Sequence, residues 1–216
     1  MAHNTPAHTP ATLIRLFLTT TLEEIVPLTQ RGVESGSKVF GAAVFEKESL
    51  EVVTVGTNHE TESPLLHGEI QTIQQFYALD RSTRPEAKNC IFFSTHEPCS
   101  LCLSGITWGG FDNFYYLFTY EDTRDVFSIP YDIDILEEVF RVPCTTCSAP
   151  PTASQPLYNH ANKFFTSSPL SSLLSQIPAG KERVELEQLW EKVRAEYGRI
   201  SGVYQDGKGE KGIPLV

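Results

Sequence analysis

Basic side chains are scarce in this sequence of 216 residues. Lysine and arginine together number 17 against 27 aspartates and glutamates, which gives a formal net charge of −10 at pH 7. Such a surface repels phosphate backbones, so the composition argues against nucleic acid as a partner. No apolar run approaches the roughly 18 residues of a membrane span, and no basic signal-peptide region precedes the apolar stretch 13–18. We therefore expect no membrane partner.

Cysteines are few and odd in number, which argues against a disulfide framework. The chain has five, and four of them form two Cys-x-x-Cys pairs; they are Cys90, Cys99, Cys102, Cys144 and Cys147. Such spacing suits metal ligands or free thiols better than disulfides. A reducing compartment follows as an expectation, the cytoplasm first and the nucleus as an alternative.

The length suits one well-packed domain with some additions, and no internal repeat is present. We expect a loose N-terminal tail over residues 1–10 and a domain over residues 11–145. A C-terminal extension over residues 146–216 should contain one amphipathic helix, at about 181–197, that either packs on the domain or caps its site.

Hydrophobic periodicity predicts alternating strands and helices. Strands are expected at 39–45 and 51–56, paired as a hairpin, and at 90–94 and 114–118. Helices are expected at 13–28 (one helix or two pieces), from 65 to the break at Arg84-Pro85, at 98–108 and at 133–140. Residues 148–172 and 202–216 read as loop and as flexible chain. Helical crossovers between strands imply an α/β fold with helices packed on a sheet.

One histidine and one Cys-x-x-Cys pair stand where metal chemistry requires them. His67 opens a predicted helix, and Cys99 and Cys102 open another, three residues apart on one helical face. One imidazole and two thiolates supply three of the four ligands of a tetrahedral zinc, which leaves one position for water. Glu69 can move protons without binding the metal. The positive ends of both helices would favour thiolate over thiol.

Other readings of the cysteines and histidines remain open. The two Cys-x-x-Cys pairs could form a structural Cys₄ zinc site, which would make the chain an interaction module. The gap of 42 positions from Cys102 to Cys144 exceeds the roughly 15 to 20 residues of common zinc ribbons. Cys144 and Cys147 could also hold a second metal or form a redox pair. His96 could approach the site or have a surface or supporting role.

Several motifs together resemble the cytidine-deaminase-like superfamily, in the branch of cytosine deaminase, guanine deaminase and tRNA adenosine deaminase. They are Phe40-Gly41-Ala42-Ala43, Gly56-Thr57-Asn58, His67-Gly68-Glu69, Glu97-Pro98-Cys99-Ser100-Leu101-Cys102 and Gly105-Ile106-Thr107-Trp108. The resemblance implies a three-layer α/β/α sandwich with a mixed sheet, and usually a homodimer with its interface near the active sites. It also implies one zinc ion on His67, Cys99 and Cys102 and a proton shuttle at Glu69.

The same resemblance implies a substrate-reading amide at Asn58, and Phe40 and Gly68 are further candidates for substrate contact. Three departures from the family pattern leave the substrate open: Val39 stands where proline is common, Gly68 where alanine is common, and residues from about 141 onward match nothing in the family. We expect a zinc-dependent hydrolytic deaminase of a free nucleobase or nucleoside. The alternatives are a tRNA adenosine deaminase, or a subunit of one, and a catalytically inactive, zinc-stabilised interaction module.

Overall fold

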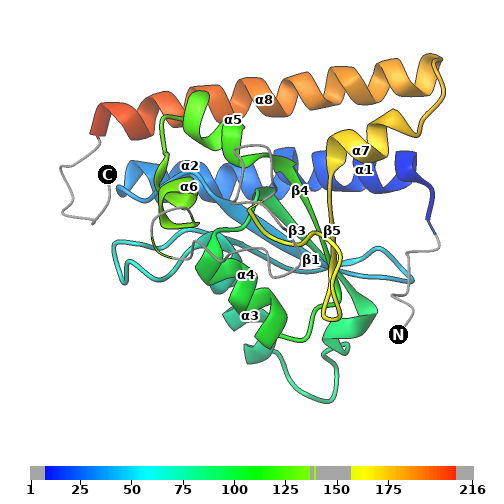
Figure 1. Ribbon diagram of the computed structural model, residues 1–216, viewed down its shortest axis with the longest axis horizontal. Coiled ribbons are helices and arrows are strands. Elements are labelled where there is room, and N and C mark those ends of the chain that lie inside the picture. The colour runs from blue at the N-terminus through cyan, green and yellow to red at the C-terminus, as the bar shows by residue number, and fades with distance from the viewer. Residues whose placement is uncertain (1–7, 137–138, 140–156, 208–216) are drawn as a thin grey trace, which may run out of the picture.

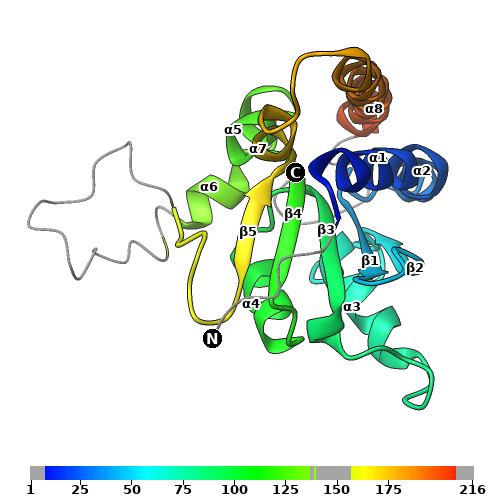
Figure 2. The same ribbon diagram turned by 90° about the vertical axis from the view of Figure 1, so that its right-hand side faces the viewer.

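A five-stranded mixed sheet organises the molecule, in a computed structural model that describes residues 8–136, 139 and 157–207. Its strand order is β2-β1-β3-β4-β5, with β1 and its two neighbours antiparallel and β3, β4 and β5 parallel. Helices cover both faces, so the predicted three-layer α/β/α architecture is confirmed (Figures 1 and 2). The strands are β1 Gly41–Glu46, β2 Val52–Thr57, β3 Cys90–His96, β4 Asn113–Phe118 and β5 Thr166–Pro169.

The N-terminal and C-terminal helices share one face of the sheet. Helix α1 (Pro10–Thr20) continues through a π-helical turn, η1 (Thr21–Ile25), into α2 (Val26–Glu34), so residues 13–28 form one helix with an irregularity. Pro27 has no N–H to donate back into the preceding turn, which explains why the helix widens there. Helices α7 (Leu170–Ser175) and α8 (Lys181–Gly207) complete this layer, and α8 runs along α1 and α2 (Figure 1).

Helices α3 (Gly68–Ala78) and α4 (Ser100–Trp108) cover the opposite face. Alternation along β3 sends neighbouring rings to opposite sides. Phe93 stacks on Phe17 of α1, with centroids 4.8 Å apart, while Phe92 packs with Phe76 of α3 and Ile106 of α4. The two cores fix the sheet between the helix layers, and β3 leads directly into the turn before α4. Shorter elements are η2 (Ala87–Asn89), α5 (Tyr120–Asp125) and α6 (Tyr131–Ile135).

The structure corrects several expectations near the chain ends. The segment expected to be loop contains β5, which pairs with β4, and α7, whose Leu170 and Leu173 enter the core. A four-residue edge strand of Thr, Ser, Ser and Pro has no alternating pattern, so only its pairing with β4 defines it. Helix α8 continues past residue 197 to Gly207 because Ile200 and Tyr204 extend its buried stripe beyond Gly198.

The N-terminal tail was expected to reach residue 10, but Thr9 already caps α1 and His8 bonds to the carbonyl of Lys47 at 2.7 Å. The helix expected at 133–140 begins earlier, as α6, with Tyr131. Cys144 and Cys147, together with residues 148–156 of the expected loop, lie outside the described residues. Within the described part of the chain, no helix has the length and apolar character needed to cross a membrane.

Candidate active site

The structure brings the predicted metal ligands together at the start of two helices. His67 immediately precedes α3, Cys99 immediately precedes α4, and Cys102 lies in the first turn of α4. Nδ1 of His67 is 3.4 Å from Sγ of Cys99 and 3.7 Å from Sγ of Cys102. A tetrahedral zinc with ordinary bond lengths would set a sulfur and a nitrogen roughly 3.6 Å apart. The three residues therefore fit a single zinc ion, and they are the one such cluster found within the described residues.

The electrostatics of these three side chains differ although they share one site. The pKa of Cys99 is lowered, because Cys102 donates a hydrogen bond to its sulfur and His67 lies beside it. Burial raises the pKa of Cys102. Burial alone would lower the pKa of His67, but the hydrogen bond and charge of Cys99 outweigh it and raise that pKa to about 9. The Cys99 thiolate is ready to bind a cation, and His67 would have to release its proton to become a ligand.

Glu69 places its carboxylate beside this cluster. The side chain is buried, its Oε1 accepts a 2.9 Å hydrogen bond from the Ser94 hydroxyl, and its Oε2 lies 3.3 Å from Sγ of Cys102. Burial, with the Cys99 thiolate adding to it, raises the pKa of the Glu69 carboxyl above its ordinary value. A carboxyl group with a raised pKa beside a metal-ligand cluster is suited to accept and release protons.

The three residues predicted to contact substrate lie around the start of α3. Asn58 follows β2, is 1 % exposed, and accepts the N–H of Gly68 on Oδ1 at 2.6 Å. The Phe40 carbonyl accepts the N–H of Asn58, and the buried ring of Phe40 packs edge-on against His96. Gly68 leaves no room for a side chain, because a Cβ there would lie 2.8 Å from the Phe40 carbonyl oxygen. Their role toward substrate stays a prediction.

Sequence reasoning missed three charged residues at this site. Lys38 and Glu60 form a buried ion pair of 2.8 Å next to Asn58. Asp132 of α6 is within electrostatic range of Cys99, His67, Glu69 and Lys38; burial is the main reason that its pKa rises to about 8. A lysine directly before a buried strand was the available signal for Lys38. Asp132 lies in a weakly patterned segment and gave none.

Residues 18–118 match the family described as the cytidine and deoxycytidylate deaminase zinc-binding region. The matched segment contains His67, Glu69, Cys99 and Cys102, which the fold has gathered into one cluster. Residues 18–118 belong to the cytidine-deaminase-like superfamily.

Individual relatives of this chain are distant. A probable cytosine deaminase of Schizosaccharomyces pombe is 22 % identical over 89 residues, which cover 41 % of this chain and 52 % of the relative. The chain thus spans about half the length of that curated relative. Among solved structures, guanine deaminase of Bacillus subtilis is 23 % identical with a TM-score of 0.47, covering 66 % of this chain and 85 % of that one. Guanine deaminase of Nitrosomonas europaea is 16 % identical with a TM-score of 0.44, covering 89 % and 90 %.

A buried carboxylate supports the turn that carries Cys99. Glu97 accepts the hydroxyl of Tyr158 on Oε1 at 2.8 Å and the N–H of Tyr120 on Oε2 at 3.1 Å. The Tyr120 hydroxyl in turn donates to the Pro98 carbonyl at 2.5 Å. Tyr158 comes from beyond the matched segment, so the C-terminal part of the chain helps to hold the turn that carries a predicted zinc ligand.

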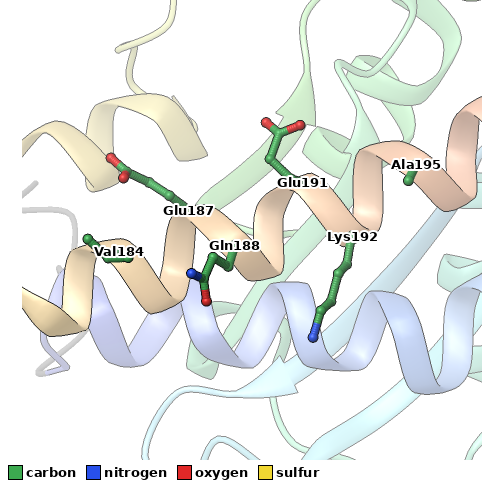
Figure 3. Close-up of a pocket in the computed structure, with 6 residues that line it drawn as sticks. All are labelled: Val184, Glu187, Gln188, Glu191, Lys192 and Ala195. Atoms are coloured by element: carbon green, nitrogen blue, oxygen red, sulfur yellow. The ribbon is translucent and has the colours of Figure 1, made fainter.

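One surface hollow of the chain lies away from this site. It follows the outer side of α8, on the sheet face opposite α3 and α4, and all its lining residues come from that single helix (Figure 3). They are Val184, Glu187, Gln188, Glu191, Lys192 and Ala195. The hollow brings together neither a set of metal ligands nor a buried acid and base, so it offers no second catalytic constellation.

Proposed function

We propose that this chain is a zinc-dependent hydrolytic deaminase that converts an amino group on a free nucleobase or nucleoside to a carbonyl and releases ammonia. The observation that supports it most strongly is the position of the buried Glu69 side chain. Its Oε2 lies 3.3 Å from Sγ of Cys102, in a cluster with the chemistry of a three-ligand zinc site. The family of residues 18–118 supports the same activity.

In this proposal His67, Cys99 and Cys102 hold the ion and Glu69 moves the protons. A zinc ion held by three protein ligands would act as a Lewis acid and would lower the pKa of the water bound at its fourth position. Glu69 would take one proton from the attacking water and deliver it to a ring nitrogen; it would then take the second proton from the newly attached hydroxyl group and pass it to the departing amine. Water and the aminated ring thus give a carbonyl and ammonia. Ser94 would hold the Glu69 carboxylate in place throughout.

The test is an ammonia-release screen over nucleobases and nucleosides, followed by the Glu69→Gln variant. The variant should retain one zinc per chain and lose ammonia release by at least 100-fold, since proton transfer contributes roughly 10² to 10⁴ in rate. Glu86→Gln is the matched control, because the Glu86 carboxylate is exposed and pairs with the exposed Lys88. Unchanged ammonia release in Glu69→Gln would contradict the role of Glu69. Zinc binding with no ammonia from any substrate would instead indicate an interaction module.

A small-molecule substrate agrees better with the charge of the chain than tRNA does. The formal net charge is −10, and a polyanion would need a basic track to bind. The screen should therefore include an adenosine-containing tRNA anticodon stem-loop. Deamination of that stem-loop, without deamination of free bases or nucleosides, would replace this substrate class with RNA.

We further propose a homodimer that uses the outer face of α4. Leu101 and Trp108 lie seven residues apart on one side of that helix, and Trp108 is 90 % exposed. Tyr77 of α3, also exposed, donates its hydroxyl to the Gly109 carbonyl beside them. Large exposed apolar side chains next to one another are typical of an interaction surface. This face belongs to the helix that carries Cys99 and Cys102 at its start, so the interface would lie near the site.

Analytical ultracentrifugation tests the dimer. Trp108→Glu should convert a dimer into monomers at micromolar concentration, whereas Val184→Glu, at an exposed apolar position of α8, should not. A wild-type chain that sediments as a monomer would refute the proposal.

A reducing compartment such as the cytoplasm is part of the same proposal. Cys99 and Cys102 are free thiols with adjacent sulfurs, and oxidation to a disulfide would remove two of the three predicted ligands. After incubation in an oxidised glutathione buffer, the zinc-free protein should no longer take up zinc. After incubation in a reduced glutathione buffer, it should still take up zinc.

A further inference from the structure

The turn that leads from β3 into α4 consists of Glu97 and Pro98, and Cys99 follows it directly. Pro98 has no N–H, so its carbonyl oxygen is the one backbone group through which it can form a hydrogen bond. That oxygen accepts the Tyr120 hydroxyl at 2.5 Å, and it belongs to the planar peptide group that ends at the Cys99 nitrogen. Holding this oxygen fixes the plane of the peptide. With φ of −62° at Cys99, it also fixes the direction in which the Cys99 side chain leaves the backbone.

Tyr120 is in turn held by the side chain of Glu97. The backbone N–H of Tyr120 donates to Oε2 of Glu97 at 3.1 Å, and the backbone N–H of Glu97 donates to the Phe118 carbonyl at 2.8 Å. Glu97 and Tyr120 are both buried, so water has little access to these bonds. Tyr120 thus bridges the turn, with its backbone on Glu97 and its hydroxyl on Pro98. The position of the Glu97 carboxylate therefore influences where that hydroxyl lies.

The other oxygen of Glu97 is bound by the C-terminal part of the chain. Oε1 accepts the Tyr158 hydroxyl at 2.8 Å, and the Tyr158 ring lies edge-on to the Tyr120 ring, with centroids 6.2 Å apart. The Tyr116 hydroxyl of β4 also bonds to this carboxylate. Of these donors, Tyr158 alone comes from beyond residue 156. Without its hydroxyl a buried carboxylate would lose a partner, so the carboxylate would turn toward the donors that remain.

Strand β5 brings Tyr158 to this place. Ser167 of β5 pairs with Phe114 of β4, beside which β5 runs at the edge of the sheet (Figure 2). The backbone N–H of Ser167 donates to the His160 carbonyl at 2.9 Å, and its hydroxyl lies 3.0 Å from Nδ1 of His160. The Tyr158 ring packs against the His160 ring, with centroids 4.4 Å apart. The pairing of β5 with β4 therefore sets the position of Tyr158.

We propose that Tyr158 is a positioning residue for the predicted zinc ligand Cys99. It acts through Glu97 and Tyr120, whose hydroxyl holds the peptide before Cys99. Residues that orient metal ligands typically contribute roughly 10- to 100-fold to metal affinity. The chain beyond residue 156 then completes the metal site, although Tyr158 itself binds no metal. This inference rests on the zinc site of the proposed function and does not depend on catalysis.

The zinc dissociation constant of Tyr158→Phe tests the proposal, because this variant loses the hydroxyl and keeps the ring. Competition with a chromophoric chelator should give a constant about tenfold higher than that of the wild type. Tyr115→Phe is the matched control and should leave the constant unchanged. It removes a hydroxyl from β4 on the opposite face of the sheet, where the Tyr115 ring packs with Phe17. An unchanged constant in Tyr158→Phe, or an equal loss in both variants, would overturn the positioning role.

A cycle of two variants tests the route through Tyr120. Tyr120→Phe removes the bond to the Pro98 carbonyl and should also weaken zinc binding about tenfold. Because both hydroxyls act on the same peptide, Tyr158→Phe combined with Tyr120→Phe should lose less affinity than the product of the two single losses. Losses that multiply would mean that Tyr158 acts independently of Tyr120, and would overturn this route.

Cobalt(II) bound in place of zinc separates positioning from a general effect on the fold. Its visible absorption depends on the geometry of the ligands, so the spectrum should change in Tyr158→Phe and stay as in the wild type in Tyr115→Phe. Weaker zinc binding with a wild-type cobalt spectrum would mean that the Tyr158 hydroxyl supports the fold alone, and would overturn the proposal. If Tyr158→Phe fails to fold, Glu97→Gln takes its place with the same readouts and outcomes, since an amide keeps the shape and loses one acceptor oxygen.

Failure of this proposal can be told apart from failure of the proposed function. A wild type that binds no zinc would refute the zinc site and, with it, the proposed function. Zinc binding by the wild type with an unchanged dissociation constant in Tyr158→Phe would refute the role of Tyr158 alone.

Discussion

The hydroxyl of Ser94 donates a 2.9 Å hydrogen bond to Oε1 of Glu69, which joins strand β3 to the first turn of α3. Both side chains are buried, and Ser94 is fully excluded from solvent. The bond leaves Oε2 of Glu69 directed at the metal-ligand cluster, next to Sγ of Cys102. The proton carrier of the proposed reaction is therefore oriented by the strand whose end leads to Cys99.

Removing this hydrogen bond should slow the reaction without releasing the metal. Ser94→Ala is expected to lower kcat about tenfold, because a hydrogen bond to a charged group contributes roughly 1.5 kcal/mol or more. Zinc content should stay at one per chain, since Ser94 touches none of the ligands. Steady-state kinetics and metal analysis check both expectations. Ser104→Ala, on the exposed side of α4, is the control and should leave kcat unchanged. An unchanged kcat in Ser94→Ala would show that Glu69 is held by other contacts.

Zinc binding should depend on two of the three described cysteines. Cys99→Ser and Cys102→Ser should each lose stoichiometric zinc after gel filtration, whereas Cys90→Ser should retain it. Burial raises the pKa of Cys90 to about 12, and its thiol faces the Glu86 carbonyl and not the ligand cluster. Inductively coupled plasma mass spectrometry gives the metal content. Loss of zinc in a Cys144→Ser, Cys147→Ser double variant would favour the Cys₄ alternative.

The sequence was sufficient to predict the metal-ligand cluster and the layered fold. The spacing of the two motifs predicts the ligands His67, Cys99 and Cys102, and the hydrophobic periodicity predicts that a helix begins at each motif. Both signals can be read directly from positions along the sequence. The strands were placed within about two residues for the same reason. β5 was missed, because an edge strand of polar residues is defined by pairing with β4 and by nothing in its own composition.

The polar surroundings of the site were beyond the sequence. Glu60 is only two residues from Asn58, yet nothing in the sequence distinguishes it from the exposed Glu62. Its buried ion pair depends on Lys38, 22 residues earlier, and on how the segment before β1 folds against the end of β2. Likewise, Tyr158 reaches Glu97 across 61 residues. Such contacts between distant segments carry no periodicity, so only the folded chain reveals them.

Gly68 stands where relatives commonly have alanine, and here an alanine should not fit. A Cβ at Gly68 would lie 2.8 Å from the Phe40 carbonyl oxygen and 2.9 Å from Cα of Gly41, both backbone atoms that cannot rotate away. Gly68→Ala is therefore expected to destabilise the protein by roughly 1 to 3 kcal/mol. Gly198→Ala in α8 meets open space and should instead stabilise by up to about 1 kcal/mol, because alanine favours helix. Urea unfolding of both variants decides. A Gly68→Ala protein as stable as the wild type would mean that β1 and α3 can separate at this point.

His96 is buried among aromatic rings, which answers the question of its location. It is 1 % exposed, and its ring lies 4.7 Å from Phe40, 4.9 Å from Phe118 and 5.4 Å from Tyr197 of α8, measured between centroids. Nδ1 bonds to the Thr95 hydroxyl at 3.0 Å, and no partner for Nε2 occurs among the described residues. A surface position is excluded. Burial lowers the pKa of His96 to about 3, so the ring stays neutral in the folded protein.

This neutral ring should make the protein less stable in acid. The unfolded chain protonates His96 near its ordinary pKa of about 6.5, whereas the folded chain does not until about pH 3. Between these values the unfolded state binds the extra proton, so the free energy of unfolding falls as pH falls. From pH 7 to pH 5 the contribution should be about 2 kcal/mol. His96→Phe, which keeps an aromatic ring in place, should lose that part of the pH dependence, while His59→Gln at an exposed position should keep it. Urea unfolding at pH 7, 6 and 5 measures the slopes, and parallel slopes for wild type and His96→Phe would mean that the folded protein admits a charged His96.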